Sequence, residues 1–169
     1  ILTCCPHDFN TFKNEYPDFG GNFEVVHHSQ FLSKLINEGK INLNSSRFKG
    51  KKITYHDPCY LGRGNGEYEA PRHIIRELKD STFTEMKRNR EFSLCCGAGG
   101  GQMFKEAEKG NKEVFIERIE DAIETKADIV ATACPFCMVM MTDGIKYKNM
   151  EETMKNYDIA ELVAIAMGL

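Results

Sequence analysis

Five of the seven cysteines in this chain have a spacing that suits one soft metal centre. They follow the pattern Cys-x35-Cys-Cys-x37-Cys-x-x-Cys, and they are Cys59, Cys95, Cys96, Cys134 and Cys137. The adjacent pair does not favour a disulfide, because neighbouring Cα atoms lie about 3.8 Å apart and disulfide geometry prefers about 5.5–6 Å. Five thiolates are also more than tetrahedral zinc needs. Their number and chemistry therefore predict an iron–sulfur-type centre.

Polar residues and glycines flank these cysteines. His56 and Asp57 directly precede the turn at Pro58-Cys59. They can hydrogen-bond to the centre and tune it or protonate a departing thiolate, or they can simply cap the end of a strand. Both are therefore candidate catalytic residues, with either role open. After the cysteine pair, glycines let the backbone turn sharply and approach whatever the sulfurs hold.

The elements expected around the cysteines alternate between strands and helices. Runs of β-branched and apolar residues predict strands over 23–27, 52–56, 83–86, 92–94 and 127–132. Apolar spacing, caps and turn signals predict helices over 5–16, 30–38, 71–78, 104–108, 114–126, 134–147 and 159–167. Such alternation is typical of βαβ units, so we expect an α/β fold with a parallel sheet and helices on both faces.

This fold would bring the distant cysteines to one edge of the sheet. Cys59, the Cys95-Cys96 pair and Cys134 each follow the carboxyl end of an expected strand. In open α/β sheets, ligands bind at that edge. The turn from Cys134 to Cys137 then enters a helix, whose N-terminal dipole stabilises thiolates.

Composition and charge narrow the class of protein. The 169 residues, 41% of them hydrophobic, suffice for one compact domain. The net charge of −3 gives no indication of nucleic-acid binding. No apolar run approaches the ~18 residues of a membrane span, and no signal peptide is apparent, so the cysteines indicate a reducing, cytoplasmic location. Because the chain opens at Ile1 inside a Cys-Cys-Pro motif, we expect it to be the C-terminal piece of a longer protein.

An internal repeat relates the two ends of the chain. Thr3-Cys4-Cys5-Pro6-His7-Asp8 is similar to Thr132-Ala133-Cys134-Pro135-Phe136-Cys137. We therefore expect residues 1–22 to be the tail of a related upstream half, and residues 23–169 to form a complete domain. Asp8 stands where the second copy has a cysteine, and its oxygen is a harder ligand than a thiolate, which argues against a full five-sulfur site upstream. Cys5 is either a ligand or a small buried residue, and Cys4 is expected to be buried.

Three segments together carry a resemblance to a known family. His56–Arg63, Cys95–Gly100 and Thr132–Cys137 resemble the cysteine-rich CCG domain of the heterodisulfide reductase B/D subunit family and related iron–sulfur oxidoreductases. The likeness covers most of the chain, although the second spacer is slightly longer than usual. It implies a noncubane [4Fe-4S] cluster held by the five cysteines named above, which a fragment made in air can lose. Members usually carry two such domains.

The resemblance also implies an activity and partners. It suggests an iron–sulfur oxidoreductase within a multi-subunit complex, which transfers electrons to or from a disulfide, a thiol or a quinone-linked acceptor. Expected partners are a ferredoxin-type, flavoprotein or membrane quinone-reactive subunit, through which the protein would lie at the membrane, and a small thiol or disulfide substrate. Two other hypotheses stay open. One is a structural zinc or assembly module with no redox role, and the other is metal-free dithiol chemistry at Cys134 and Cys137.

Overall fold

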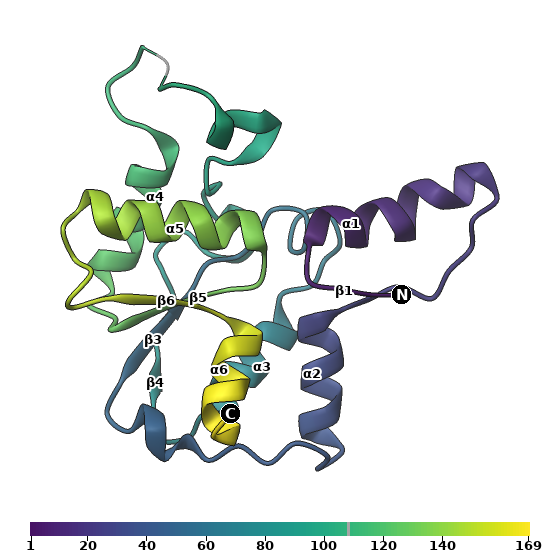
Figure 1. Ribbon diagram of the computed structural model, residues 1–169, viewed down its shortest axis with the longest axis horizontal. Coiled ribbons are helices and arrows are strands. Elements are labelled where there is room, and N and C mark those ends of the chain that lie inside the picture. Colours follow the sequence, from purple (N-terminus) through teal and green to yellow (C-terminus); the bar gives the residue numbers. More distant parts are fainter. Residues whose placement is uncertain (108) are drawn as a thin grey trace.

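The computed structural model describes residues 1–107 and 109–169, and it contains two parallel sheets surrounded by helices (Figure 1). Its strands and α-helices are, in chain order, β1 (Leu2–Thr3), α1 (Pro6–Asn10), β2 (Val26–His27), α2 (His28–Asn37), β3 (Lys52–Tyr55), α3 (Glu69–Glu77), β4 (Thr82–Phe83), α4 (Val114–Glu124), β5 (Ile129–Thr132), α5 (Pro135–Tyr147), β6 (Lys155–Asp158) and α6 (Ile159–Met167). A π-helical segment covers Thr11–Glu15, and 3₁₀ turns cover Tyr16–Phe19, Ser45–Phe48, Arg90–Phe92 and Gly99–Phe104.

The main sheet has the order β4-β3-β5-β6, and all of its strands are parallel. Helices α4 and α5 pack together on one face, whereas α3 and α6 cover the other (Figure 1). The predicted α/β fold, with a parallel sheet and helices on both faces, is therefore confirmed.

Strand β5 shows why this sheet is buried on both sides. Ile129 and Ala131 enter the core beneath α3 and α6, and Val130 enters the core beneath α4 and α5. All three side chains are buried. A strand that faces two helical layers buries side chains on both of its faces, which explains the continuous apolar run at 129–131 in its sequence.

The order of the strands creates a crevice between β3 and β5. The chain passes from β3 outward to β4 and then returns to place β5 on the opposite side of β3. The two crossovers therefore leave from the carboxyl ends of β3 and β5 toward different faces of the sheet. This is the position at which open α/β sheets bind ligands.

A separate two-stranded sheet lies at the start of the chain. β1 pairs in parallel with β2, and Thr3 is opposite His27. Between them, α1 and the residues up to 25 extend from the body of the molecule as an arm (Figure 1). Because β2 lies beyond residue 22, this sheet pairs the expected tail at 1–22 with the domain that follows it, and the division of the chain at residue 22 stays a prediction.

Some predicted elements differ from the structure. Residues 92–94 form no strand, because the chain is held in a turn in which the Asp57 carboxylate accepts the backbone N–H of Arg90 at 2.8 Å. No α-helix occupies 104–107, because left-handed glycines at 100 and 101 break the chain into a 3₁₀ turn that ends at Phe104; residue 108 lies outside the described residues. The polar strand β6 was not predicted, and its last residue, Asp158, caps the predicted helix that follows it.

Candidate metal centre

Three segments bring all five predicted cysteines around one enclosed cavity. Cys59 follows β3, Cys95 and Cys96 lie on the loop before the glycine-rich turn, and Cys134 and Cys137 lie at the start of α5. The cavity is at the carboxyl ends of β3 and β5, the crevice that the strand order predicts. The Cys95-Cys96 pair reaches it without the strand expected at 92–94.

The five sulfur atoms form a continuous series of hydrogen-bonding contacts. The series runs from Cys59 through Cys95, Cys96 and Cys137 to Cys134. All of these cysteines are free of disulfides. Such a set places soft donors from distant parts of the chain within reach of a single centre.

The pKa is lowered for two of the five thiols, Cys95 and Cys134. Hydrogen bonds from the Cys59 and Cys96 thiols lower the pKa of Cys95, and the backbone N–H of Gly97 also donates to its Sγ at 3.3 Å. A hydrogen bond from Cys137 and backbone N–H groups at the start of α5 lower the pKa of Cys134.

The other three sulfurs act as the donors. Hydrogen bonding to Cys95 and then burial raise the pKa of Cys59, and hydrogen bonding to Cys134 raises that of Cys137. The hydrogen bond with Cys137 lowers the pKa of Cys96, but the hydrogen bond to Cys95 and burial together raise it to about 11. The pKa is thus lowered at one end of the series, at Cys134, and next to its other end, at Cys95, and it is raised at the three cysteines that donate to them. This donor set fits an iron–sulfur cluster, which thiolates ligate.

Aromatic side chains from the arm and from α5 close one wall of the cavity. The His7 ring lies 4.4 Å from that of Tyr60 and 5.3 Å from that of Phe136, between ring centroids. Pro6 lines the cavity beside them. This role of the arm was not predicted, because ring contacts between segments depend on the tertiary fold.

Asp57 anchors the loop that carries Cys59. Its buried carboxylate accepts two hydrogen bonds from Arg72, at 2.6 and 2.8 Å, and a third from the backbone of Arg90. Arg72 is itself fully buried and also binds Glu85 through two nitrogens. Both carboxylate oxygens of Asp57 are therefore occupied by structural partners.

His56 lies directly beneath the sulfurs and is fully buried. Its Nδ1 accepts a hydrogen bond of 2.8 Å from Nε of Arg118, and one of its ring nitrogens lies within 4.8 Å of Sγ of Cys96 and of Cys137. Burial, and secondarily the charge of Arg118, hold the pKa of His56 well below its usual value. Arg118 in turn donates to Asp121 and to the backbone oxygen of Arg88.

The two buried arginines were missed from the sequence. Arg118 lies on the inward face of α4, directly before the buried Ile119, and Arg72 precedes Ile74 and Ile75 in α3. A basic residue at a core position of an amphipathic helix is the signal that could have found them. Cys4, which was expected to be buried, is exposed, whereas Cys5 is buried with its Sγ 3.7 Å from Nδ1 of His7.

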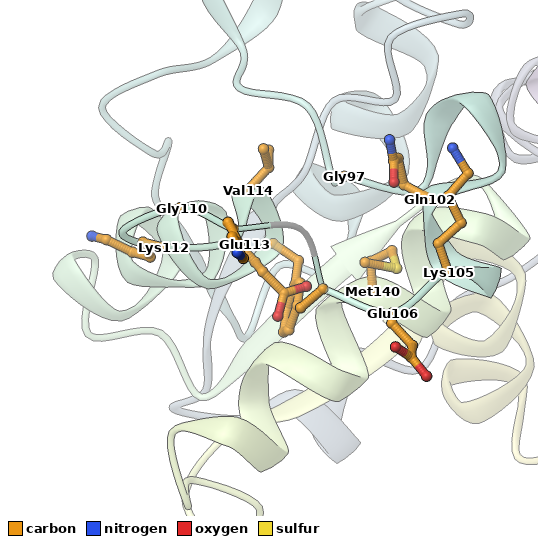
Figure 2. A pocket seen from close by; sticks show the side chains of 12 residues that line it. Gly97, Gln102, Lys105, Glu106, Gly110, Lys112, Glu113, Val114 and Met140 are labelled. Atoms are coloured by element: carbon orange, nitrogen blue, oxygen red, sulfur yellow. The ribbon is translucent and has the colours of Figure 1, made fainter.

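Two larger pockets adjoin this region. One, of about 360 Å³, has a mostly apolar lining and shares His7, Ala98, Gly99 and Phe136 with the sulfur cavity. The other, of about 290 Å³, lies between the glycine-rich turn and the start of α4 (Figure 2). None of the described cysteines lines this second pocket, and its Lys112 is already paired with Glu117 and Glu120. The apolar pocket is therefore the one that leads to the sulfurs.

The chain matches the model of the CCG cysteine-rich domain over residues 53–142. It is 44% identical over 164 residues to the probable iron-sulfur-binding oxidoreductase FadF of Bacillus subtilis, covering 97% of this chain and 23% of that protein. It is 42% identical over 173 residues to the EtfAB:quinone oxidoreductase of Syntrophomonas wolfei, covering 99% and 24%. It is 40% identical over 176 residues to one subunit of the dihydromethanophenazine:CoB--CoM heterodisulfide reductase of Methanosarcina barkeri, covering 100% and 41%.

These relatives are all much longer than the chain, which spans between about a quarter and two fifths of their lengths. None of the helices in the described part of the chain is long and apolar enough to span a membrane.

Proposed function

The chain belongs to the family of CCG cysteine-rich domains, and from this premise we propose that it is an electron-transferring iron–sulfur module. Its proposed cofactor is a [4Fe-4S] cluster of the noncubane type. The proposed ligands are Cys59, Cys95, Cys96, Cys134 and Cys137. The observation that carries the proposal is that these five sulfurs, from three separate segments, line one enclosed cavity.

The number of sulfurs separates this proposal from a structural zinc site. Tetrahedral zinc takes four ligands, so one thiol of the five would have no role. The series of sulfur contacts includes every one of the five cysteines. A donor set in which all members are in contact supports the larger, sulfur-rich cofactor.

When bound, such a cluster supplies one-electron oxidation and reduction. The chain's own residues would hold it and control its surroundings. Apolar walls from Pro6, Tyr60 and Phe136 would keep water away from the sulfurs, and Asp57 with Arg72 would fix the loop of Cys59. The apolar pocket beside Phe136 would admit the electron acceptor.

The wider activity is proposed from the printed names of the relatives. These include an iron-sulfur-binding oxidoreductase, a quinone oxidoreductase and a heterodisulfide reductase. We infer that this chain works within a cytoplasmic redox complex. It would pass electrons between a ferredoxin-type, flavoprotein or quinone-reactive partner and a disulfide, thiol or quinone-linked acceptor. The turn from β1 through Cys5 and Pro6 into α1 resembles the turn from β5 through Cys134 and Pro135 into α5, which supports the further proposal that residues 1–22 are the tail of a related upstream half.

Iron and sulfide analysis of anaerobically reconstituted protein, combined with EPR, tests the proposal. We expect about four irons per chain. Cys96→Ser should lose the oxidised EPR signal, because it removes a proposed ligand. Cys4→Ser is the matched control, since Cys4 is exposed and does not line the cavity, and it should keep both iron and signal. Stoichiometric zinc without iron in the wild-type protein would contradict the proposal and favour the structural module.

A further inference from the structure

One ring nitrogen of the buried His56 has no hydrogen-bond partner among the described residues. This atom is Nε2, and the His56 side chain is fully buried next to Cys96 and Cys137. A buried polar atom without a partner costs about 1–3 kcal/mol, so native structures rarely keep one without a reason. The position of the His56 ring beside these sulfurs suggests that the partner of Nε2 belongs to the metal centre.

The opposite side of the ring determines which nitrogen carries the proton. Nδ1 lies 2.8 Å from Nε of Arg118. A guanidinium has only donors, so Nδ1 must accept and must be unprotonated. In a neutral imidazole the proton then resides on Nε2. Arg118 therefore makes the unpartnered atom a hydrogen-bond donor.

This arrangement argues against His56 as a metal ligand. A ligating histidine presents an unprotonated nitrogen to the metal and normally donates its other N–H to a carboxylate or a carbonyl. Here the other nitrogen faces a donor, and ligation through Nε2 would require the proton to move to Nδ1, against Arg118. The grouping of His56 with Cys96 and Cys137 is thus better explained by a hydrogen bond than by a coordinate bond.

The buried side chains around Arg118 hold it in place. Its Nη1 donates to Asp121 at 3.0 Å and to the backbone oxygen of Arg88 at 2.7 Å. Arg88 also binds Asp121 through two nitrogens, each at 2.8 Å. Asp121 in α4 and Arg88 in the loop before the cysteine pair therefore hold the guanidinium of Arg118 in place. This restraint keeps its hydrogen bond to His56.

We propose that His56 donates its Nε2 proton to a sulfur atom of the loaded metal centre, and that Arg118 is the positioning residue that fixes this tautomer. The sulfur is either a ligand thiolate or an inorganic sulfide, which are equivalent as acceptors. This inference rests on the proposed function. An N–H donor to sulfur stabilises the more negatively charged, reduced centre, so it should raise the reduction potential.

The tautomer is measured first, by long-range proton–nitrogen NMR of the wild-type protein labelled with ¹⁵N-histidine, before and after anaerobic reconstitution with iron and sulfide. A proton on Nε2 in both samples is the expected result. A proton on Nδ1 in either sample would overturn the proposal. This measurement needs no variant, so it holds even if substitutions at His56 prevent folding.

The potential is measured next, on reconstituted His56→Leu and His56→Gln. The leucine has no donor, so we expect the equilibrium constant for one-electron reduction to fall about tenfold, which is about 59 mV. The glutamine keeps an N–H group at a similar distance along the side chain and should restore most of the difference. An unchanged potential in His56→Leu at full iron content would overturn the proposal, as would loss of iron from both variants when they remain folded, which would identify His56 as a ligand.

The outcomes separate this inference from the proposed function. Wild-type protein that takes up no iron contradicts the proposed function, and this inference with it. Wild-type protein that takes up iron but fails the tautomer or potential test contradicts the role of His56 alone.

Discussion

Two turns of this molecule have the same local design, and only one of them supplies cysteines to the sulfur cavity. At the end of β1, Cys5 is extended and precedes Pro6 at the start of α1; at the end of β5, Cys134 is extended and precedes Pro135 at the start of α5. Each turn leads into a helix, then into a strand that pairs in parallel with the strand before the turn, and then into a second helix. The two units meet where Nε2 of His28 lies 2.9 Å from Asp158.

The surroundings of the two cysteines differ. Cys134 contacts Cys137 one helical turn later, and through it the rest of the sulfur series. Cys5 has Asp8 at the equivalent position and contacts His7 instead. The comparison teaches that a strand–cysteine–proline–helix turn is a scaffold. The metal centre arises only where loops from other strands bring their thiols to it.

The largest predicted difference between the two turns is seen when one cysteine is removed from each. We expect Cys137→Ser to lose its iron almost completely, because the sulfur series is interrupted between Cys96 and Cys134. Cys5→Ser should retain the wild-type iron content, because Cys5 does not line the sulfur cavity. Iron analysis after anaerobic reconstitution distinguishes the two. Equal losses in both variants would show that the first turn supplies a ligand as well.

The buried network that anchors the loop of Cys59 predicts the next largest effect. Asp57→Asn should lower the free energy of unfolding by about 3 kcal/mol, because breaking a buried ion pair leaves Arg72 partly uncompensated. Urea denaturation measures this change. Glu38→Gln is the control: Glu38 forms a solvent-exposed pair with Lys40 just after the end of α2, and its removal should have little effect, since water screens its charge. Comparable losses in the two variants would contradict the structural role of Asp57.

A pH dependence should distinguish the histidine beside the first turn. Burial lowers the pKa of His27 from 6.5 to about 3. Between these values the unfolded chain binds a proton that the folded chain does not, so stability falls as the pH falls through this range. One such group contributes a slope of about 1.4 kcal/mol per pH unit.

His27→Gln should therefore reduce the pH slope of the unfolding free energy between pH 6 and pH 4 by about one proton. Ser29→Ala removes the hydroxyl that lies 2.8 Å from Nδ1 of His27 but keeps the histidine, so it should keep the slope. Urea denaturation at several pH values supplies both numbers. An unchanged slope in His27→Gln would mean that His27 does not stay neutral in the folded protein.

The smallest predicted effect concerns how tightly α5 is held. A Cβ on Gly144 would lie 2.9 Å from Cβ of Ile119 in α4, so Gly144→Ala should force these helices apart. The overpacking should lower the free energy of unfolding by about 1–3 kcal/mol, whereas the higher helix propensity of alanine should raise it by about 1 kcal/mol. We therefore expect the free energy of unfolding to fall by about 1 kcal/mol. Gly110→Ala, where the added Cβ meets no atom within 4 Å, is the control for urea denaturation. A higher free energy of unfolding in Gly144→Ala would show that Ile119 can move to make room for the added Cβ.

The sequence was sufficient to predict the parallel sheet, because the apolar run of β5 and the periodicity of α4 carry strong local signals. It was also sufficient to select the five cysteines that the structure brings together. It failed for β6, whose residues Lys155–Asp158 are polar and form a strand only because β5 offers an open edge. It failed for the loop at 92–94, where hydrogen bonds to Asp57 override a weak strand preference.

The supporting residues of the centre were harder to predict than the cysteines. Arg72 and Arg118 come from helices far from the cysteines in sequence, and their partners become visible only when the helices are packed. The same holds for His7, which closes the cavity from the arm. The residue type alone suggests the chemistry of a cysteine, whereas the role of a buried arginine depends on the charged groups that the fold places around it.

The wide separation of the cysteine segments also has a consequence for the polymer physics of the chain. Spacers of 35 and 37 residues lie between the three segments. A centre that binds all of them would cross-link the unfolded chain into two loops and remove much of its conformational freedom. Closing a loop of this length by a covalent cross-link is worth roughly 4 kcal/mol in the chain-entropy model. The protein with its metal centre bound should therefore be more stable to unfolding, because the centre restricts the denatured chain as two cross-links would.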